Sequence, residues 1–521
     1  MKEVVLDGGA LRRADVVAVA DGGRRASLGE AAIPAMEASR QVVADAFEHD
    51  RIVYGVTTGF GALSNTRVGH DDALAMQVHL LRSHAAGVGD PLPDRLVRAM
   101  LLLRARTLAQ GHSGVRPDIP RRLLDLVNRD LLPVVPAKGS VGASGDLAPF
   151  AHLALPLIGE GFLRDGSGAA PEPASDVLAR HGLEPLALHA KEGLSLLNGT
   201  EGMLALGVLH LDRIEQLAAA ADLAAAVTIE ALLGSVRPFD PRIHALRAHP
   251  GQAVVAANIV RLLDESPITA SHHDDFDHAV QDAYSLRCVP QVHGAVRDVA
   301  AGAAAVFERE LHAVVDNPIV FGDTGDVVSA GNFHGQPLAF QLDFLAIAAA
   351  ELGSISERRT DRLLDPARSC GLPPFLAPNP GRDSGYMLAQ YTAAALVAEN
   401  RILCHPASID TIPTSGSQED HVSMGFTAGL KLGAVLDNVT RVLAVELACG
   451  VQGLELRRPL ASAAGTAAVD RAIRAVVPPL DADRPPGPDI EAIAELIDDG
   501  TLVAAAEGAI GPLDRLGVVE V

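Results

Sequence analysis

The stretch GSVGASGDLAP, which begins at Gly139, places three small residues, Ala143, Ser144 and Gly145, beside a carboxylate, Asp146. In a tightly held turn, the backbone nitrogen of Gly145 can attack the carbonyl carbon of Ala143 and close a five-membered ring with loss of water. Dehydration of Ser144 then leaves an exocyclic methylene, which is an electrophile. Glycine permits the dihedral angles that such a turn needs, and Asp146 can assist proton transfers. On this stretch alone, an ordinary turn that ends in a helix N-cap stays an alternative.

Other motifs in the chain point to the same chemistry. With the Ala-Ser-Gly loop, seven motifs follow the order found in the aromatic amino acid ammonia-lyase family, whose members make a methylidene-imidazolone (MIO) group from an Ala-Ser-Gly triplet. The chain resembles this family from about Tyr54 to Met424. The other six motifs are YGVTTGFG from Tyr54, RSHAAGVG from Arg82, LNGTEGM from Leu197, QDAYSLRCVPQ from Gln281, GNFHGQP from Gly331 and QEDHVSM from Gln418.

The resemblance implies a carbon–nitrogen lyase that removes ammonia from an amino acid. The amine is a poor leaving group and the β-proton is weakly acidic, so the family activates the substrate with the MIO electrophile. We expect this group to form from Ala143, Ser144 and Gly145. The chain has only four lysines, none in a recognisable pyridoxal-phosphate context, and no nucleotide-binding loop. We therefore predict no external cofactor.

The resemblance also implies the catalytic residues. Tyr54 lies in a Gly-rich loop able to close over a site and is our candidate for the base that removes the β-proton. Its phenol has a reference pKa of about 10, so the site must shift or deprotonate it. Tyr284 is expected to stabilise charge or relay protons. Glu419 is expected to share in proton transfer.

Four further residues are predicted to bind the substrate or to hold the electrophile. Arg287 offers a guanidinium fork that matches a substrate carboxylate. Asn198 and Gln281 carry amide donors suited to that carboxylate or to the ring oxygen, where they would make the methylidene more electrophilic. Phe333 is predicted to pack against the substrate ring.

His84 and Glu419 indicate the substrate. An imidazole ring needs a polar partner in the pocket; His84 can donate to it or accept from it, and Glu419 can take its N–H. Family members that act on phenylalanine or tyrosine usually carry Phe-Leu or His-Leu at the position of Ser83-His84. The motifs are thus most similar to the histidine-specific branch, in which L-histidine gives trans-urocanate and ammonia.

Two alternatives stay open from the sequence. A tyrosine or phenylalanine ammonia-lyase, or a 2,3-aminomutase, would use the same electrophile. A non-catalytic paralogue that acts as a scaffold would keep the fold alone. Glu201 stands where many family members have Gln, and His293 stands where we expect a small or apolar residue, so both are candidates for altering substrate fit.

Composition limits the class of protein and its partners. The chain has 521 residues, of which 48% are hydrophobic, and its formal net charge is −22 at pH 7. An acidic surface disfavours nucleic acids and anionic membranes as partners. The four cysteines form no CxxC pair, and the N-terminus lacks the apolar core of a signal peptide. We predict a cytoplasmic protein that binds neither nucleic acid nor membrane.

Hydrophobic periodicity predicts a mainly all-α fold. Ala and Leu dominate and β-branched runs are scarce, which favours helices packed on helices. We expect an elongated bundle of long helices with a smaller, mixed N-terminal part that carries the Ala-Ser-Gly loop. The expected domains are residues 1–200 and residues 201–521. The expected helices cover about residues 71–110, 146–159, 202–234, 297–314, 338–359, 385–403 and 424–454.

The sequence also predicts how the chain assembles and whether it binds a metal. The resemblance implies a homotetramer whose active sites are built from three chains, with an amino acid as the small-molecule substrate. Long Ala-rich helices suit such packing between subunits. HHDDFDH, from His272, is rich in metal-ligand types, but we interpret it as an exposed loop and predict no metal site.

Overall fold

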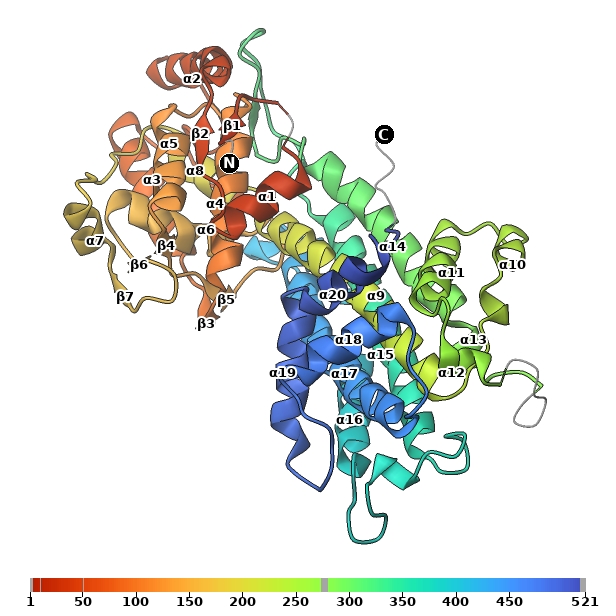
Figure 1. The fold of residues 1–521 in the computed structure, drawn as a ribbon. Helices are drawn as coiled ribbons and strands as arrows, with labels where there is room; N and C mark the ends of the chain where they lie inside the picture. The colour runs from red at the N-terminus through yellow and green to blue at the C-terminus, as the bar shows by residue number, and fades with distance from the viewer. Residues whose placement is uncertain (1–2, 10, 50, 273–279, 516–521) are drawn as a thin grey trace. The chain divides into compact units, whose positions relative to one another are not determined.

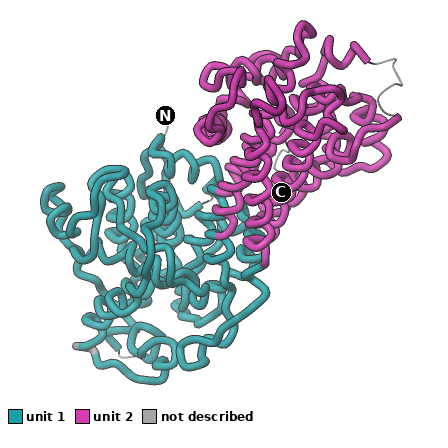
Figure 2. The backbone as a smooth tube through the Cα atoms, turned by 90° about the horizontal axis from the view of Figure 1, so that it is seen from below, with its two compact units in different colours: residues 1–209, 306–342, 406–430 teal, residues 210–305, 343–405, 431–521 magenta. Residues whose placement is uncertain are grey.

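The computed structural model describes residues 3–9, 11–49, 51–272 and 280–515. Helices dominate these residues, as the sequence predicts, and the strands are short (Figure 1). The chain forms two compact units, each drawn from separate stretches (Figure 2). Unit 1 consists of residues 1–209, 306–342 and 406–430, and unit 2 consists of residues 210–305, 343–405 and 431–521. The boundary near residue 200 stays a prediction about domains.

Short helices and small sheets make up most of unit 1. Its strands are β1 (Val4–Leu6), β2 (Ala26–Leu28), β3 (Val88–Pro91), β4 (Leu131–Pro133), β5 (Pro136–Lys138), β6 (Phe162–Asp165), β7 (Pro171–Pro173), β8 (Ile319–Val320) and β9 (Val327–Val328). Its helices are α1 (Arg13–Ala20), α2 (Ile33–Glu48), α3 (His70–His84), α4 (Asp94–Ala109), α5 (Asp118–Asn128), α6 (Leu147–Ala154), α7 (Ala174–Arg180) and α8 (Glu192–Leu197).

Helix α4 is the core of unit 1. Nearly every residue from Leu96 to Ala109 is buried, and the helix packs against α1 and α5. The β1–β2 pair is parallel, whereas β3–β5 and the three-stranded sheet β4-β6-β7 are antiparallel. Strand β5 ends just before the Ala-Ser-Gly loop and α6 begins just after it, so both ends of the loop are anchored.

Long helices supply most of unit 2, and several of them extend into unit 1. They are α9 (Glu201–Ala231), α14 (Val289–Glu310), α15 (Gln336–Leu364), α16 (Met387–Leu403) and α17 (Gly425–Leu456). Shorter helices are α10 (Pro241–Ala245), α11 (Pro250–Leu262), α12 (Pro267–Ala270), α13 (Tyr284–Arg287), α18 (Ala464–Arg474), α19 (Pro486–Asp498) and α20 (Thr501–Ile510). The five predicted long helices are confirmed.

The structure corrects one predicted helix. Residues 71–110 form two helices, α3 and α4, with β3 between them, rather than one continuous helix. The interruption falls at GVGDPLP, where glycine and proline end helical hydrogen bonding. The separation matters for the site because His84 becomes the last residue of α3.

Buried ion pairs join the long helices within unit 2. Glu446 of α17 accepts hydrogen bonds from Thr228 of α9 at 2.8 Å and from the Arg359 guanidinium of α15. Because a buried charge without a partner is strongly unfavourable, these contacts fix the register of the three helices. Among the described residues, one helix, α15, is long and apolar enough by composition to span a membrane, and 56% of its most apolar window is buried in the fold.

Candidate active site

The Ala-Ser-Gly loop contains three glycines with positive φ, of which Gly139 has φ +142°. Gly142 has φ +69° and Gly145 has φ +80°, a conformation that residues with a side chain adopt only at a cost. Ala143 and Gly145 are buried, whereas Ser144 is half-buried. The loop therefore turns tightly and leaves Ser144 as the accessible member of the triplet.

Gly199 holds this loop from the opposite side. Its N–H donates to the Ser144 carbonyl oxygen at 3.4 Å, and its own carbonyl accepts from the Asp146 N–H at 2.8 Å. The two backbones approach so closely that a Cβ on Gly145 would overlap the Gly199 carbonyl. The turn that ring closure requires is therefore open only to glycine at position 145.

Asp146 is fully buried beside the loop. Its carboxyl accepts hydrogen bonds from the Met203 N–H at 2.8 Å and from the Ser140 hydroxyl at 3.0 Å. Burial raises the pKa of Asp146 to about 7, and the nearby Glu201 also raises it. A carboxyl that titrates near neutrality is suited to both giving and taking a proton.

A cavity of about 540 Å³ opens in front of Ser144, entirely within unit 1. Five of the predicted site residues line it: Tyr54, His84, Ser144, Asn198 and Glu419. Apolar side chains, including Phe60, Met76, Leu147 and Leu194, form much of the remaining wall. A concave, largely apolar site with a few convergent polar groups is the usual form of a small-molecule pocket.

Tyr54 lies in the Gly-rich loop, where its hydroxyl oxygen accepts a hydrogen bond from the Gly61 N–H at 3.2 Å. The Phe60 ring meets the Tyr54 ring edge-on at 6.2 Å between centroids. Burial raises the pKa of Tyr54 above its ordinary value, the Gly61 N–H lowers it, and Glu419 raises it further. The net shift is opposite to the one that a base acting at neutral pH requires, so this chain alone does not activate the phenol.

His84 ends α3 and projects into the same cavity. Its Nδ1 lies 3.0 Å from the Leu80 carbonyl oxygen and 3.1 Å from the Ser83 hydroxyl. Burial lowers the pKa of His84, which favours the neutral ring. With Nδ1–H donated to the Leu80 carbonyl, Nε2 is left as an acceptor for a substrate N–H.

Glu419 is the acidic residue of the cavity wall. One carboxylate oxygen, Oε1, lies 3.5 Å from the Ser144 hydroxyl, and the other, Oε2, accepts from the Thr414 hydroxyl at 2.8 Å. The structure thus brings an imidazole and a carboxylate to one pocket that also contains the proposed electrophile.

Asn198 is buried at the end of α8, and its side chain donates to the Asn317 carbonyl oxygen at 2.8 Å. The Arg104 guanidinium donates to the Asn198 backbone carbonyl. The sequence predicts Asn198 as a donor to the ring oxygen or the substrate; in the structure, the backbone N–H of Gly199 is the donor to the Ser144 carbonyl. Neither Gly199 nor Arg104 was among the predicted site residues.

The remaining predicted residues do not line this cavity. Gln281, Tyr284 and Arg287 belong to unit 2, where Gln281 and Arg287 line a separate cavity. Tyr284 is 71% exposed, with the Arg287 guanidinium 4.8 Å from its ring centroid. Phe333 belongs to unit 1 and is half-buried in the segment before α15.

Glu201 and His293 are buried in the core and line none of these cavities. Glu201 forms an ion pair with Arg104 at 2.7 Å, and burial raises the pKa of Glu201. His293 Nδ1 lies 2.9 Å from Asp222. Neither residue contacts the pocket, so the predicted effect on substrate fit would have to be indirect. Both side chains belong to polar clusters in the core.

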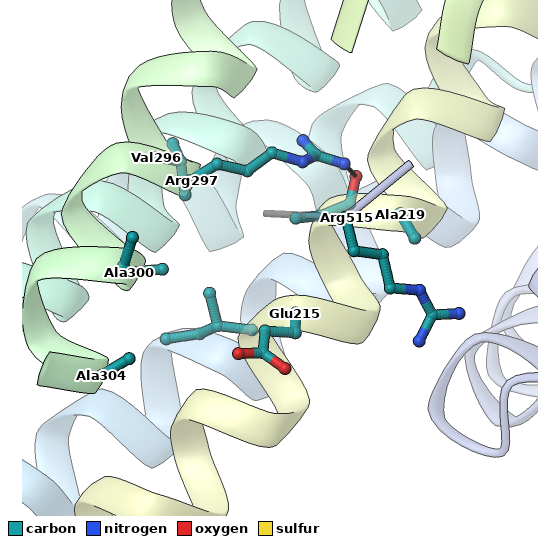
Figure 3. A pocket seen from close by; sticks show the side chains of 10 residues that line it. Glu215, Ala219, Val296, Arg297, Ala300, Ala304 and Arg515 are labelled. Atoms are coloured by element: carbon teal, nitrogen blue, oxygen red, sulfur yellow. Dashed lines mark hydrogen bonds between the residues drawn. The ribbon is translucent and has the colours of Figure 1, made fainter. Parts of the chain in front are cut away.

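Unit 2 contains other cavities, of about 520 Å³ and 890 Å³, neither of which the Ala-Ser-Gly loop lines. A cavity of only about 40 Å³ lies between α9 and α14 in unit 2; five of its ten lining residues are alanines, and Glu215 and Arg515 also line it (Figure 3). It has room for little more than water. Among the described residues, no group of three His, Cys, Asp or Glu side chains is placed to hold a metal ion. Most of the HHDDFDH motif lies outside those residues.

Comparisons with known proteins identify the family of this chain. The family model for aromatic amino acid lyases matches residues 11–475. The histidine ammonia-lyase of Gloeobacter violaceus is 53% identical over 98% of this chain and 99% of its own length, and that of Anaeromyxobacter dehalogenans is 52% identical over 96% and 100%.

Solved structures resemble the fold over the same length. The crystal structure of histidine ammonia-lyase from Trypanosoma cruzi has a TM-score of 0.88 and 39% identity, and covers 98% of this chain and 96% of that one. Tyrosine aminomutase from Streptomyces globisporus has a TM-score of 0.93 and 37% identity, covering 98% and 100%.

Proposed function

Because the chain belongs to the aromatic amino acid lyase family, in which it is a carbon–nitrogen lyase, we propose that it removes ammonia from L-histidine to give trans-urocanate, the first step of histidine degradation. One observation carries this proposal: His84 and Glu419, the two groups suited to an imidazole, line the same cavity as Ser144. A phenyl ring has no polar atom to pair with His84 Nε2 or with Glu419, whereas an imidazole N–H can donate to either.

The residues present fit the MIO group. Ala143 and Gly145 are buried, Gly145 is left-handed, and the close approach of Gly199 leaves no space for a side chain at position 145. Once formed, the group supplies an electrophilic carbon that activates the substrate for loss of ammonia. Ala143, Ser144 and Gly145 would hold it as part of the backbone, so no external cofactor is needed.

Two features of this chain then support the elimination, and a third supports maturation of the loop. The Gly199 N–H, which donates to the Ser144 carbonyl, is placed to stabilise negative charge on that oxygen. His84 Nε2 can accept the substrate imidazole N–H, and Glu419 can pair with the other side of the ring. Asp146, with its pKa near 7, is placed to move protons during maturation of the loop.

We assign removal of the β-proton to Tyr54. Its hydroxyl lies in the cavity with Ser144 and Glu419, but burial raises its pKa. A positive charge beside the phenol would lower that pKa. Arg287 and Tyr284, which the family resemblance assigns to the site, lie outside this cavity, and we propose that neighbouring chains of a homotetramer supply them together with Gln281.

Exposed apolar side chains support such an assembly. They recur along two of the long helices: Phe344 and Ile347 on α15, and Leu388, Tyr391 and Ile402 on α16. Several exposed apolar side chains on one helix are typical of a contact between proteins. In the tetramer, Arg287 would clamp the substrate carboxylate with two parallel hydrogen bonds, and Phe333 would pack against the substrate ring.

The net charge and the state of the cysteines support the proposed cellular setting. The net charge of −22 disfavours nucleic acid and anionic membrane surfaces, and the four cysteines are free. We propose a cytoplasmic enzyme whose partners are its amino-acid substrate and its own copies.

Intact-mass measurement and an ammonia assay together test the proposal. Ring closure and Ser144 dehydration each remove one water, so the purified chain should weigh two waters less than its sequence and should release ammonia from L-histidine. A chain of unmodified mass that releases no ammonia would support the non-catalytic alternative. A chain with the two-water loss that acts only on tyrosine would support the aminomutase or tyrosine-lyase alternative.

A further inference from the structure

Two adjacent hydroxyls, those of Thr414 and Ser415, contact two different parts of the active site. The Thr414 hydroxyl donates to Glu419, and the Ser415 hydroxyl accepts from the backbone of the Gly-rich loop that carries Tyr54. We propose that Thr414 and Ser415 are positioning residues, through which one tight turn holds both the carboxylate and the tyrosine of the reaction. This inference rests on the proposed function and identifies what orients its two proton-handling groups.

Thr414 fixes the orientation of Glu419. Its hydroxyl lies 2.8 Å from Glu419 Oε2, and the two residues also form a pair of backbone hydrogen bonds, at 3.0 and 3.3 Å. A carboxylate turns easily about its last bond, because that torsion has a broad, two-fold profile. With Oε2 held, Oε1 is the oxygen left to face Ser144, at 3.5 Å.

Ser415 fixes the Gly-rich loop. Its hydroxyl oxygen accepts from the Ala62 N–H at 3.2 Å, and it lies so close to Gly61 that a Cβ at that position would overlap it. Gly61 in turn donates its N–H to the Tyr54 hydroxyl at 3.2 Å. Ser415 therefore fastens the backbone that contacts the phenol oxygen.

The turn that carries these hydroxyls has a strained backbone. Ser415, Gly416 and Ser417 have φ values of +51°, +61° and +66°, and the two serines adopt this left-handed conformation against their intrinsic preference. Strained backbone of this kind concentrates at functional sites, where the surrounding structure maintains it. Here the turn directs the Thr414 hydroxyl to Glu419 and the Ser415 hydroxyl to the Gly-rich loop.

The test compares isosteric variants in the full-length enzyme. Thr414→Val keeps the shape of the side chain and removes its donor, so kcat for L-histidine should fall about 10- to 100-fold, with KM changed by less than about threefold. Thr414→Ser should restore most of the lost rate. Ser415→Ala should also lower kcat, by about tenfold. Thr411→Val is the matched control, because the Thr411 hydroxyl accepts from the Val422 N–H in the same segment and contacts neither group.

A double-mutant cycle separates positioning from loss of structure. If Thr414 acts through Glu419, Thr414→Val should cost almost nothing in a Glu419→Ala background, which has no acceptor for the Thr414 hydroxyl. Equal kcat values for Thr414→Val and Thr411→Val, or independent penalties in the cycle, would overturn the inference. A wild-type enzyme that is inactive towards L-histidine would instead overturn the proposed function, so the two failures are distinguishable.

Discussion

Arg104 and Glu201 form an ion pair at 2.7 Å in which both side chains are completely buried. Arg104 also donates to the backbone carbonyl of Asn198, and the next residue, Gly199, holds the Ala-Ser-Gly loop through two backbone hydrogen bonds. The ion pair therefore supports the segment that shapes the electrophile-forming turn.

Breaking this pair should destabilise the fold. Glu201→Leu leaves the buried Arg104 without its carboxylate, and the loss of one partner of a buried pair typically costs about 3–5 kcal/mol. Glu201→Gln should cost less, because an amide oxygen can still accept a hydrogen bond. Urea unfolding followed by circular dichroism measures both. Glu491→Gln, at the exposed end of a surface pair with Arg441, is the control; an equal loss there would contradict the account.

The buried Asp146 should make stability depend on pH. Burial raises its pKa from 3.8 to about 7, so the folded chain keeps a proton that the unfolded chain releases. This contribution is fully present below the unfolded pKa and is lost as the pH rises through the folded one. Asp146→Asn mimics the neutral form, and its stability relative to wild type should rise between pH 5 and pH 8, by about 3 kcal/mol.

Thermal or urea unfolding of Asp146→Asn and wild type over that pH range checks this prediction. The raised pKa of Glu201 acts in the same direction in both proteins, so it largely cancels in the difference. A difference in stability that stays constant from pH 5 to pH 8 would show that Asp146 is not protonated in the folded chain.

Gly145→Ala should prevent maturation of the loop. The position has φ +80° and no space for a Cβ beside the Gly199 carbonyl, so the turn that brings the Gly145 nitrogen to the Ala143 carbonyl should not form. We expect the unmodified mass and a loss of activity on the order of a thousandfold or more. Gly302→Ala is the control, since that helical glycine has open space around it; it should keep the two-water loss.

His84→Leu should weaken the preference for histidine. The substitution removes the Nε2 acceptor from the cavity and leaves the substrate N–H unpaired, and mismatches of this kind commonly cost 10²-fold or more, roughly, in kcat/KM. Replacing Ser83-His84 together by Phe-Leu should shift the preference further, towards phenylalanine or tyrosine. Steady-state kinetics with the three amino acids measures this, and an unchanged preference for histidine would remove the basis of the specificity argument.

Much of the architecture and part of the site are predictable from the sequence. Apolar periodicity predicts the long helices, because it reports which faces must be buried. The motif order predicts that Tyr54, His84 and Glu419 meet at Ser144, although more than three hundred residues separate the first from the last. The structure places these residues around one cavity, and their roles there stay predictions, since a resemblance to a family transfers contacts that no local pattern contains.

The residues that support the site are not predictable in the same way. Arg104 is one of several arginines on α4, and no local pattern distinguishes it from the others. The partners of Glu201 and Thr414 depend on the fold rather than on local spacing. The interruption between α3 and α4 shows a further limit, since helical periodicity alone does not show where glycine and proline will break the helix. Gln281, Tyr284 and Arg287 need a neighbouring chain under our proposal, which one sequence does not describe.

Ultraviolet absorbance of the purified enzyme, incubated separately with L-histidine, L-tyrosine and L-phenylalanine, tests the central claim most directly. The account predicts the conjugated product band of urocanate with L-histidine alone, and no band from a Ser144→Ala variant. A band with tyrosine or phenylalanine but not with histidine would contradict the roles of His84 and Glu419, and a band that survives Ser144→Ala would contradict the role of the loop.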